Sequence, residues 1–175
     1  MSYAWAGYLW PPQLRACEAV VDALQHGVNR VCLYGPTGGG KTTIAVELSR
    51  WALTHGCGSS FYLNRKLLVP QTAAAYEKAG LPVGIRAADY EDRYDFSSPC
   101  QICSADTERV RVYEKKTWNP HYSQLVIVDE AHIQRTETMR QIVADHMAHG
   151  AQVVGLTATP IGLAKWFDKL IVPGR

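Results

Sequence analysis

The sequence has none of the features that mark a membrane-spanning, secreted or disordered chain. None of its apolar runs approaches the roughly 20 residues that a helix needs to cross a bilayer. The N-terminus has neither the basic stretch nor the cleavage pattern of a secretory signal. Charged residues make up 19% of the chain and hydrophobic residues 47%, which excludes a disordered protein and favours a globular one. We therefore expect a cytoplasmic protein with no membrane partner.

A strong charge of one sign and a cysteine framework are also missing. The net charge is +2, so composition alone does not indicate nucleic-acid binding, and any polyanion must be met by a local patch. The five cysteines are odd in number, which argues for a reducing compartment. Cys100 and Cys103 have the spacing of a zinc or redox half-site, but neither a second cysteine pair nor a histidine pair follows at ligand spacing. A pair of buried strand cysteines is the favoured interpretation.

The chain contains no internal repeat and no low-complexity linker. Its 175 residues suit one domain and are too few for two complete α/β domains. We therefore predict a single domain over residues 1–175, in which residues 1–12 form an aromatic lead-in.

Residues 35–42 fit the G-x-x-x-x-G-K-[ST] signature of a phosphate-binding loop, between an apolar run and an amphipathic one. Glycines let successive backbone N–H groups turn inward around a polyphosphate. Lys41 then supplies a positive charge to the β- and γ-phosphates, and the hydroxyl of Thr42 is placed to ligate Mg²⁺. The alternative is a glycine-rich turn that merely ends a strand. We predict a nucleoside triphosphate site formed by Pro36, Thr37, Gly38, Gly39, Gly40, Lys41, Thr42 and Thr43.

Strand-like and helix-like patterns alternate along the whole chain. Strands are predicted over residues 28–34, 59–63, 83–87, 99–104, 125–128 and 152–156. Amphipathic helices lie between them, although residues 105–116 could be helical or partly extended, and residues 161–175 include one more short amphipathic piece. This alternation predicts an α/β fold with a mainly parallel sheet and helices on both faces. The turns that follow the strands should then share one edge of the sheet.

Two carboxylates follow the most apolar predicted strand. Asp129 comes directly after four apolar residues, where it can face the phosphate loop and hold Mg²⁺. Glu130 is placed to orient or deprotonate the water that attacks the γ-phosphate. The alternative is that the acidic pair caps the following helix. Together with the phosphate loop, the pattern favours Lys41 and Glu130 as the catalytic residues.

With these motifs in place, the chain resembles a known family. Asp129-Glu130-Ala131-His132 spells a DEAH box. With the phosphate loop and Thr157-Ala158-Thr159, it makes the chain similar to the first RecA-like domain of superfamily 2 helicases and translocases of the phage or DNA-repair type. The resemblance implies a RecA-like P-loop NTPase that uses ATP and Mg²⁺. Its partners would be a DNA or RNA backbone and a second RecA-like domain, in cis or in trans.

The resemblance also implies roles for individual residues. Gln13 would read adenine, with Tyr8 or Trp10 available to stack on the base. Arg65 and Lys66, with Thr107 after a later strand, would face the nucleic-acid backbone, although a solvated charge cluster is the alternative for the two cations. The residues that would link the nucleotide state to domain movement are His132, Thr157 and Thr159.

A second RecA-like domain does not fit after about residue 160, so the 175 residues alone should turn ATP over slowly or not at all. In phosphoryl-transfer enzymes the missing arginine finger contributes on the order of 10³–10⁵ in rate. One rival interpretation is a free-standing nucleotide-dependent binding module that works with a separate partner domain. A small P-loop kinase is the other, but the sequence shows no arginine-bearing lid or acceptor pocket.

The histidines other than His132 carry no clear function in the sequence. We expect four of them, at helix ends or polar positions, to face solvent: His26, His55, His146 and His149. No role is assigned to His121.

Overall fold

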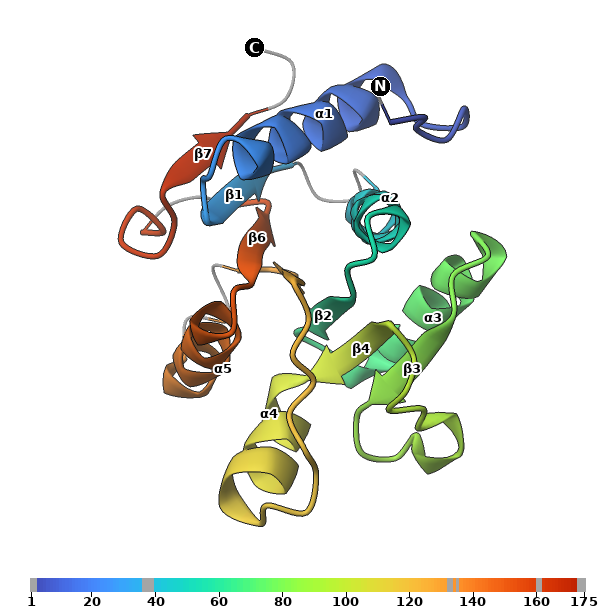
Figure 1. Ribbon diagram of the computed structural model, residues 1–175, viewed down its shortest axis with the longest axis vertical. Helices are drawn as coiled ribbons and strands as arrows, with labels where there is room; N and C mark the ends of the chain where they lie inside the picture. The colour runs from blue at the N-terminus through green and yellow to red at the C-terminus, as the bar shows by residue number, and fades with distance from the viewer. Residues whose placement is uncertain (1–2, 36–39, 132–133, 135, 160–161, 173–175) are drawn as a thin grey trace.

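The fold is described from a computed structural model over residues 3–35, 40–131, 134, 136–159 and 162–172. It is a seven-stranded sheet between two layers of helices (Figure 1). The strands are β1 (Arg30–Tyr34), β2 (Ser59–Leu63), β3 (Val83–Arg86), β4 (Cys100–Ser104), β5 (Leu125–Val128), β6 (Gln152–Thr157) and β7 (Lys169–Ile171). The α-helices are α1 (Pro11–Gln25), α2 (Lys41–Thr54), α3 (Val69–Lys78), α4 (Ala105–Glu108) and α5 (Glu137–Ala148).

Every strand pair in the sheet is parallel, and the strand order is β3-β4-β2-β5-β6-β1-β7. The predicted α/β fold with a mainly parallel sheet is confirmed. Because all strands point the same way, their carboxyl ends lie along one edge, where the turns that follow β1, β2, β4, β5 and β6 gather. None of the described helices has the length and apolar character needed to cross a bilayer.

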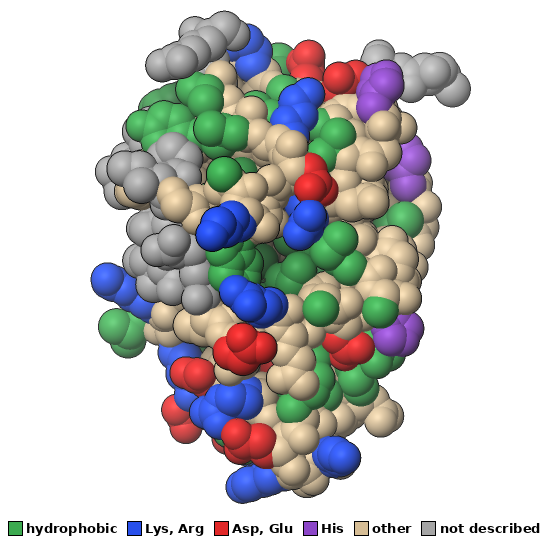
Figure 2. Space-filling model, turned by 90° about the vertical axis from the view of Figure 1, so that its left-hand side faces the viewer, with side chains coloured by type: hydrophobic (Ala, Val, Ile, Leu, Met, Phe, Trp, Pro, Cys, Tyr) green, Lys and Arg blue, Asp and Glu red, His purple; other side chains and the backbone are tan. Residues whose placement is uncertain are grey.

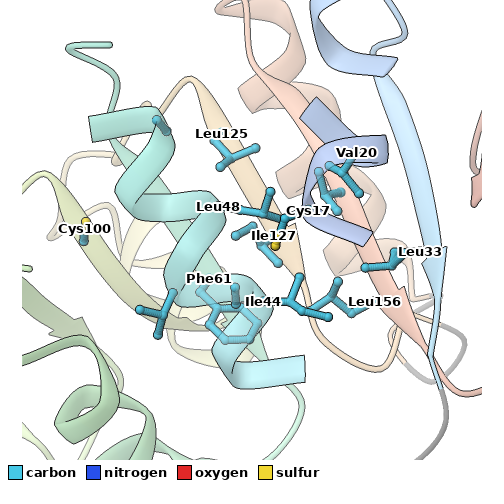
Figure 3. Packing of buried hydrophobic residues seen from close by; sticks show 14 of the residues in the cluster. Cys17, Val20, Leu33, Ile44, Leu48, Phe61, Cys100, Leu125, Ile127 and Leu156 are labelled. Carbon is cyan, nitrogen blue, oxygen red and sulfur yellow. The ribbon is translucent and has the colours of Figure 1, made fainter. Parts of the chain in front are cut away.

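Alternate residues of the strands pack on opposite faces of the sheet. One face carries Leu33, Phe61, Ile127 and Leu156 and is covered by α1, α2 and α3. Figure 3 shows side chains of α1 and α2 meeting these strand residues. The other face includes Tyr62 and is covered by α4, α5 and the turn before β7. Both faces of the sheet are therefore buried, which explains why the central strand β5 reads as an unbroken apolar run.

The cysteines of β4 behave as predicted. Cys100 and Cys103 are both buried free thiols, and each packs on a different face of the sheet. Burial raises the pKa of both thiols. Their spacing therefore reflects strand packing.

The carboxyl-terminal part of the chain differs from the prediction. Residues 161–175 were expected to include a short amphipathic piece, but residues 169–171 form the edge strand β7, with Val31 opposite Lys169 and Leu33 opposite Ile171. Three residues are too few for a hydrophobic period to be recognised. Pairing with β1, which lies far away in the sequence, decides the conformation.

Residues 105–114 of the stretch 105–116 are helical rather than extended. It begins as α4, where the Ser104 hydroxyl accepts a bond from the Thr107 N–H, and continues as a π-helical turn over Arg109–Glu114. Helix α3 follows a 3₁₀ turn over Lys66–Leu68 and has Pro70 in its first turn, where the missing N–H costs no hydrogen bond.

The burial of His146 corrects another prediction. It was expected to face solvent, but it is 5% exposed, and its Nε2 lies 2.9 Å from the Tyr62 hydroxyl on β2. Its spacing explains this, since Met139, Ile142 and His146 recur at helical intervals on the buried face of α5. Burial, with the nearby His121, lowers the pKa of His146 to about 4.

Because His146 stays neutral in the folded protein, acidification is expected to destabilise the fold. The unfolded chain takes up this proton near pH 6.5 and the folded chain only near pH 4, so the unfolded state binds more protons between these values. The contribution of neutral His146 to the free energy of unfolding is complete above pH 6.5 and falls by about 3 kcal/mol as the pH drops to 4.

Urea unfolding across this pH interval measures the effect. The His146→Phe variant should lose stability less steeply than the wild type as the pH falls, whereas the exposed His149→Gln control should keep the wild-type slope. Identical slopes for the wild type and the phenylalanine variant would contradict the assignment.

Candidate nucleotide site and nucleic-acid interface

The turns that carry the predicted motifs are joined by backbone hydrogen bonds at the carboxyl edge of the sheet. The N–H of Gly35, directly after β1, donates to the carbonyl of Thr157 at the end of β6 (2.8 Å). The N–H of Ala131, two residues after Asp129, donates to the carbonyl of Leu156 (2.9 Å). The start of the phosphate loop, the acidic turn after β5 and the Thr157 turn therefore lie side by side.

Part of the phosphate loop lies outside the described residues, namely Pro36, Thr37, Gly38 and Gly39. The described end of the loop is Gly40, which caps α2 with a φ of 77°, a backbone conformation that favours glycine. A Cβ on Gly40 would also collide with the side-chain amide of Gln13. The first turn of α2 then holds Lys41, Thr42 and Thr43, each with a partly buried side chain.

Lys41 and Glu130 meet at this edge. The Lys41 ammonium forms an ion pair with the Glu130 carboxylate, although the two residues are 89 positions apart, and their side chains are 14% and 19% exposed. Glu130 also has a φ of 49°, which is uncommon for a residue with a Cβ. Such backbone conformations cluster at functional sites. The structure thus brings together the predicted phosphate-binding cation and the predicted general base.

Asp129 and Thr42 provide oxygen donors of the kind that Mg²⁺ prefers. Asp129 directly follows β5 and is 8% exposed, and Thr42 stands beside Lys41 in the first turn of α2. Within the described ranges, no three His, Cys, Asp or Glu side chains form a group that could hold a metal. A nucleotide-bound Mg²⁺ needs no such group, because one or two protein oxygens, the phosphates and water complete its shell. The donor set therefore fits Mg²⁺ carried by a nucleotide.

Gln134 holds the acidic turn, and sequence reasoning missed it. Its side chain is 9% exposed, and its Nε2 donates to the carbonyls of Tyr62 (3.0 Å) and Asp129 (2.5 Å). Its backbone N–H donates to the carbonyl of Glu130 (3.2 Å). Gln134 therefore ties the turn to the end of β2. No local pattern signals this, because Tyr62 is 72 positions away in the chain.

The Thr157 turn adjoins the phosphate loop. The Thr157 side chain is fully buried, its hydroxyl donates to the carbonyl of Thr159, and it accepts a bond from the Thr159 N–H (2.9 Å each). Since the Thr157 carbonyl also accepts the Gly35 N–H, the turn contacts the loop through its backbone. His132, the third predicted coupling residue, lies outside the described residues.

The residues predicted to face nucleic acid divide into two groups. Arg65 and Lys66 are both exposed in the turn after β2, and the Lys66 Nζ lies 3.7 Å from a carboxylate oxygen of Asp89. Thr107 is 4% exposed, and its hydroxyl accepts a bond from the Ala88 N–H (3.0 Å). The two cations are accessible to a polyanion, whereas Thr107 holds the turn after β3 in place.

A hollow of about 400 Å³ lies beside Lys66, at the carboxyl ends of β2 and β4. Asn64 lines it, and the Oδ1 atom of this side chain is buried and has no hydrogen-bond partner among the described residues. The hollow is also lined by Leu63, Ser104, Ala105, Asp106, Gln134 and Thr136. Polar side chains from three separate turns therefore surround one concave surface next to the acidic turn.

The charge is mixed on the side of the molecule that carries α5 and β7 (Figure 2). Figure 2 shows basic and acidic side chains interspersed over the face on the α5 and β7 side, without a continuous basic area. This agrees with the net charge of +2 and with the expectation that a polyanion must be met locally.

Comparison with known proteins gives a family and a fold. The family described as type III restriction enzyme, res subunit, matches residues 8–162 of the chain. Among solved structures, the UvsW helicase from bacteriophage T4 is similar, with a TM-score of 0.71 and 16% identity over 98% of this chain and 63% of that chain.

Two further structures are similar. The type ISP restriction-modification enzyme LlaGI, a nuclease-deletion mutant in complex with a DNA substrate mimic, has a TM-score of 0.72 and 16% identity over 95% of this chain and 20% of that chain. The Hef helicase domain of Pyrococcus furiosus has a TM-score of 0.68 and 22% identity over 90% of this chain and 37% of that chain. The chain thus spans less than two thirds of each of these three structures.

Proposed function

The chain belongs to the family of the type III restriction enzyme res subunit and has the fold of the first RecA-like domain of superfamily 2 helicases, and we propose that it is an ATP-binding motor domain. Paired with a second RecA-like domain, in cis or in trans, it would couple Mg-ATP hydrolysis to movement along nucleic acid or to its remodelling. We favour DNA over RNA because LlaGI, which shares the fold, was solved with a DNA substrate mimic.

The convergence of Lys41 and Glu130 carries this proposal. A cation at the end of a phosphate loop and a carboxylate at a strand end are the two groups that NTP hydrolysis needs, one for phosphate and one for water. The ion pair between them shows that both side chains reach the same point. A glycine-rich turn without this function would not require a partly buried lysine and a glutamate at positive φ to meet there.

The mechanism follows from the positions of these side chains. A triphosphate in the loop offers Lys41 several anionic oxygens, so the ammonium can exchange Glu130 for phosphate. Glu130 is then released to orient a water and accept its proton. Asp129 and Thr42 would hold Mg²⁺, which supplies positive charge to the β- and γ-phosphate oxygens. Gln134 fixes the backbone of the turn that carries both carboxylates, because it donates hydrogen bonds to the carbonyls of Asp129 and Glu130.

Arg65 and Lys66 are the proposed contacts to the nucleic-acid backbone. Both follow β2 at the same edge of the sheet, and Lys66 lines the hollow described above. Contacts from such cations to phosphates position a duplex or strand without reading its sequence. The proposed interaction is therefore independent of sequence and sensitive to salt.

Nucleotide binding by the chain in the presence and absence of Mg²⁺ tests the function. We expect the 175-residue chain to bind Mg-ATP and to bind ATP at least about tenfold more weakly in EDTA, because Asp129 then has no cation to share with the phosphates. Equilibrium titration with a fluorescent ATP analogue measures both affinities. A chain that binds no nucleotide with Mg²⁺ present, although circular dichroism shows it folded, would refute the proposal.

A further inference from the structure

One buried carboxylate fastens the N-terminal segment to helix α2. Glu47 lies within α2 with 0% of its surface exposed, and two residues of the segment donate hydrogen bonds to it. The Ala6 N–H donates to its Oε1 (3.0 Å), and the Tyr8 hydroxyl donates to its Oε2 (3.2 Å). Figure 1 shows this segment in dark blue, beside the start of α1 and above α2. A single side chain of α2 therefore holds two points of the segment.

Arg50, one helical turn beyond Glu47, completes the anchor. Its Nη2 donates to the Glu47 carboxylate (2.7 Å) and to the carbonyl of Ala4 (3.2 Å), and its guanidinium lies 5.0 Å from the centre of the Tyr3 ring. Burial opposes ionisation of Glu47, but Arg50 and the N–H of Ala6 hold the pKa of this carboxyl below its ordinary value. The charge of Glu47 is therefore compensated, and the anchor persists at neutral pH.

The anchored segment leads directly to the candidate nucleotide site. After Tyr8 the chain reaches Trp10, which caps α1, and the Trp10 N–H donates to the Oε1 of Gln13 (3.0 Å). The amide of Gln13 lies against Gly40, the residue before Lys41. Tyr8 and Trp10 are 60% and 71% exposed. Tyr8 and Trp10, whose rings could stack on a nucleobase, are thus held on or next to the segment that Glu47 anchors.

We propose that Glu47 is a positioning residue for nucleobase recognition, acting through Ala6 and Tyr8 without touching the nucleotide. The inference rests on the proposed function, because it takes the segment and Gln13 to face the base of bound ATP. Without the anchor, the segment loses its fixed place relative to the loop, while the phosphate contacts of Lys41 remain. Glu47 thus affects how tightly the nucleobase is bound and which base is preferred. It does not affect binding of the triphosphate group itself.

Affinities for Mg-ATP, Mg-GTP and Mg-tripolyphosphate, measured by competition titration, test the inference. The wild type should prefer ATP to GTP. The Glu47→Ala variant should bind ATP about tenfold more weakly, as expected when hydrogen bonds to a charged group are lost, and bind tripolyphosphate as the wild type does. The ratio of its affinities for ATP and GTP should fall toward one.

Two further variants sharpen the test. Tyr8→Phe keeps the exposed ring and removes only the hydroxyl that bonds to Glu47, so it should reduce the ATP preference about threefold, in line with one hydrogen bond. Glu18→Gln removes an exposed carboxylate from α1 and should behave as the wild type. If Glu47→Ala does not fold, as judged by circular dichroism, the surface variant Tyr8→Phe decides the question.

The possible outcomes separate this inference from the proposed function. If Glu47→Ala loses affinity for ATP and for tripolyphosphate equally, the positioning role is overturned. Unchanged selectivity between ATP and GTP in Tyr8→Phe would also overturn it. A wild type that binds ATP and GTP equally would also overturn it, while leaving the triphosphate site intact. A wild type that binds neither ATP nor tripolyphosphate would refute the proposed function itself.

Discussion

Replacing Glu130 with glutamine is expected to slow ATP hydrolysis by about 10²–10⁴-fold, the range that a positioned general base contributes, while Mg-ATP remains bound. Glutamine keeps the size of the side chain but cannot accept a proton from water. The contact between Glu130 and Lys41 places this carboxylate beside the cation that would hold the γ-phosphate. Single-turnover hydrolysis of radiolabelled ATP over long times measures the rate, because the chain alone is expected to be slow.

The matched control for this variant is Glu137→Gln. Glu137 lies at the start of α5, and its side chain is 87% exposed. This change should leave both binding and hydrolysis at wild-type values. A Glu130→Gln protein that hydrolyses ATP at the wild-type rate would rule out the proposed base, and one that no longer binds ATP would show that the carboxylate serves binding instead.

Replacing Lys41 with alanine is expected to weaken Mg-ATP binding by about 10- to 100-fold, which corresponds to the loss of a charge-assisted hydrogen bond of about 1.5–3 kcal/mol. Lys41 is the first residue of α2, and the left-handed backbone conformation belongs to Gly40 before it. Alanine therefore fits the helical backbone at position 41, and the substitution removes only the charged side chain. Hydrolysis should fall with binding, since the γ-phosphate loses its cation. The two variants therefore differ, because Glu130→Gln keeps its affinity for Mg-ATP and Lys41→Ala binds it more weakly.

Titration with the same fluorescent ATP analogue measures this loss, and Lys165→Ala, an exposed lysine in the turn before β7, provides the control. Removing Lys41 also takes one partner from Glu130, so the urea midpoint of the variant should be determined in parallel. An affinity equal to that of the wild type would remove Lys41 from the nucleotide site and would contradict the proposed function.

Much of the fold could be predicted from local patterns. The strands at residues 59–63 and 125–128 coincide with their predictions because β5 is a short apolar run and β2 ends in three consecutive large side chains after a glycine-rich turn. The order of strands and helices follows from the same alternation, and the parallel sheet follows from connections long enough to cross over. Helix α2 was predicted because its phosphate-loop signature fixes its first residue.

The misses share a physical cause. β7 exists because β1 offers a free edge, and His146 is buried because Tyr62 of β2 lies beneath α5. Glu47 looks like any polar residue of an amphipathic helix, yet the N-terminal segment covers it. In each case the deciding contact comes from a distant part of the chain, which a local pattern does not contain.

The sequence by itself determined the α/β class, the phosphate-loop signature and the acidic pair at residues 129 and 130, because these depend on residue type and short spacing. Only the tertiary structure decided that Lys41 meets Glu130, that Gln134 supports the acidic turn and that Glu47 anchors the N-terminal segment. The physical reason is that parallel strands bring their carboxyl ends to one edge whatever their separation along the chain, and side-chain contacts form only after that edge exists.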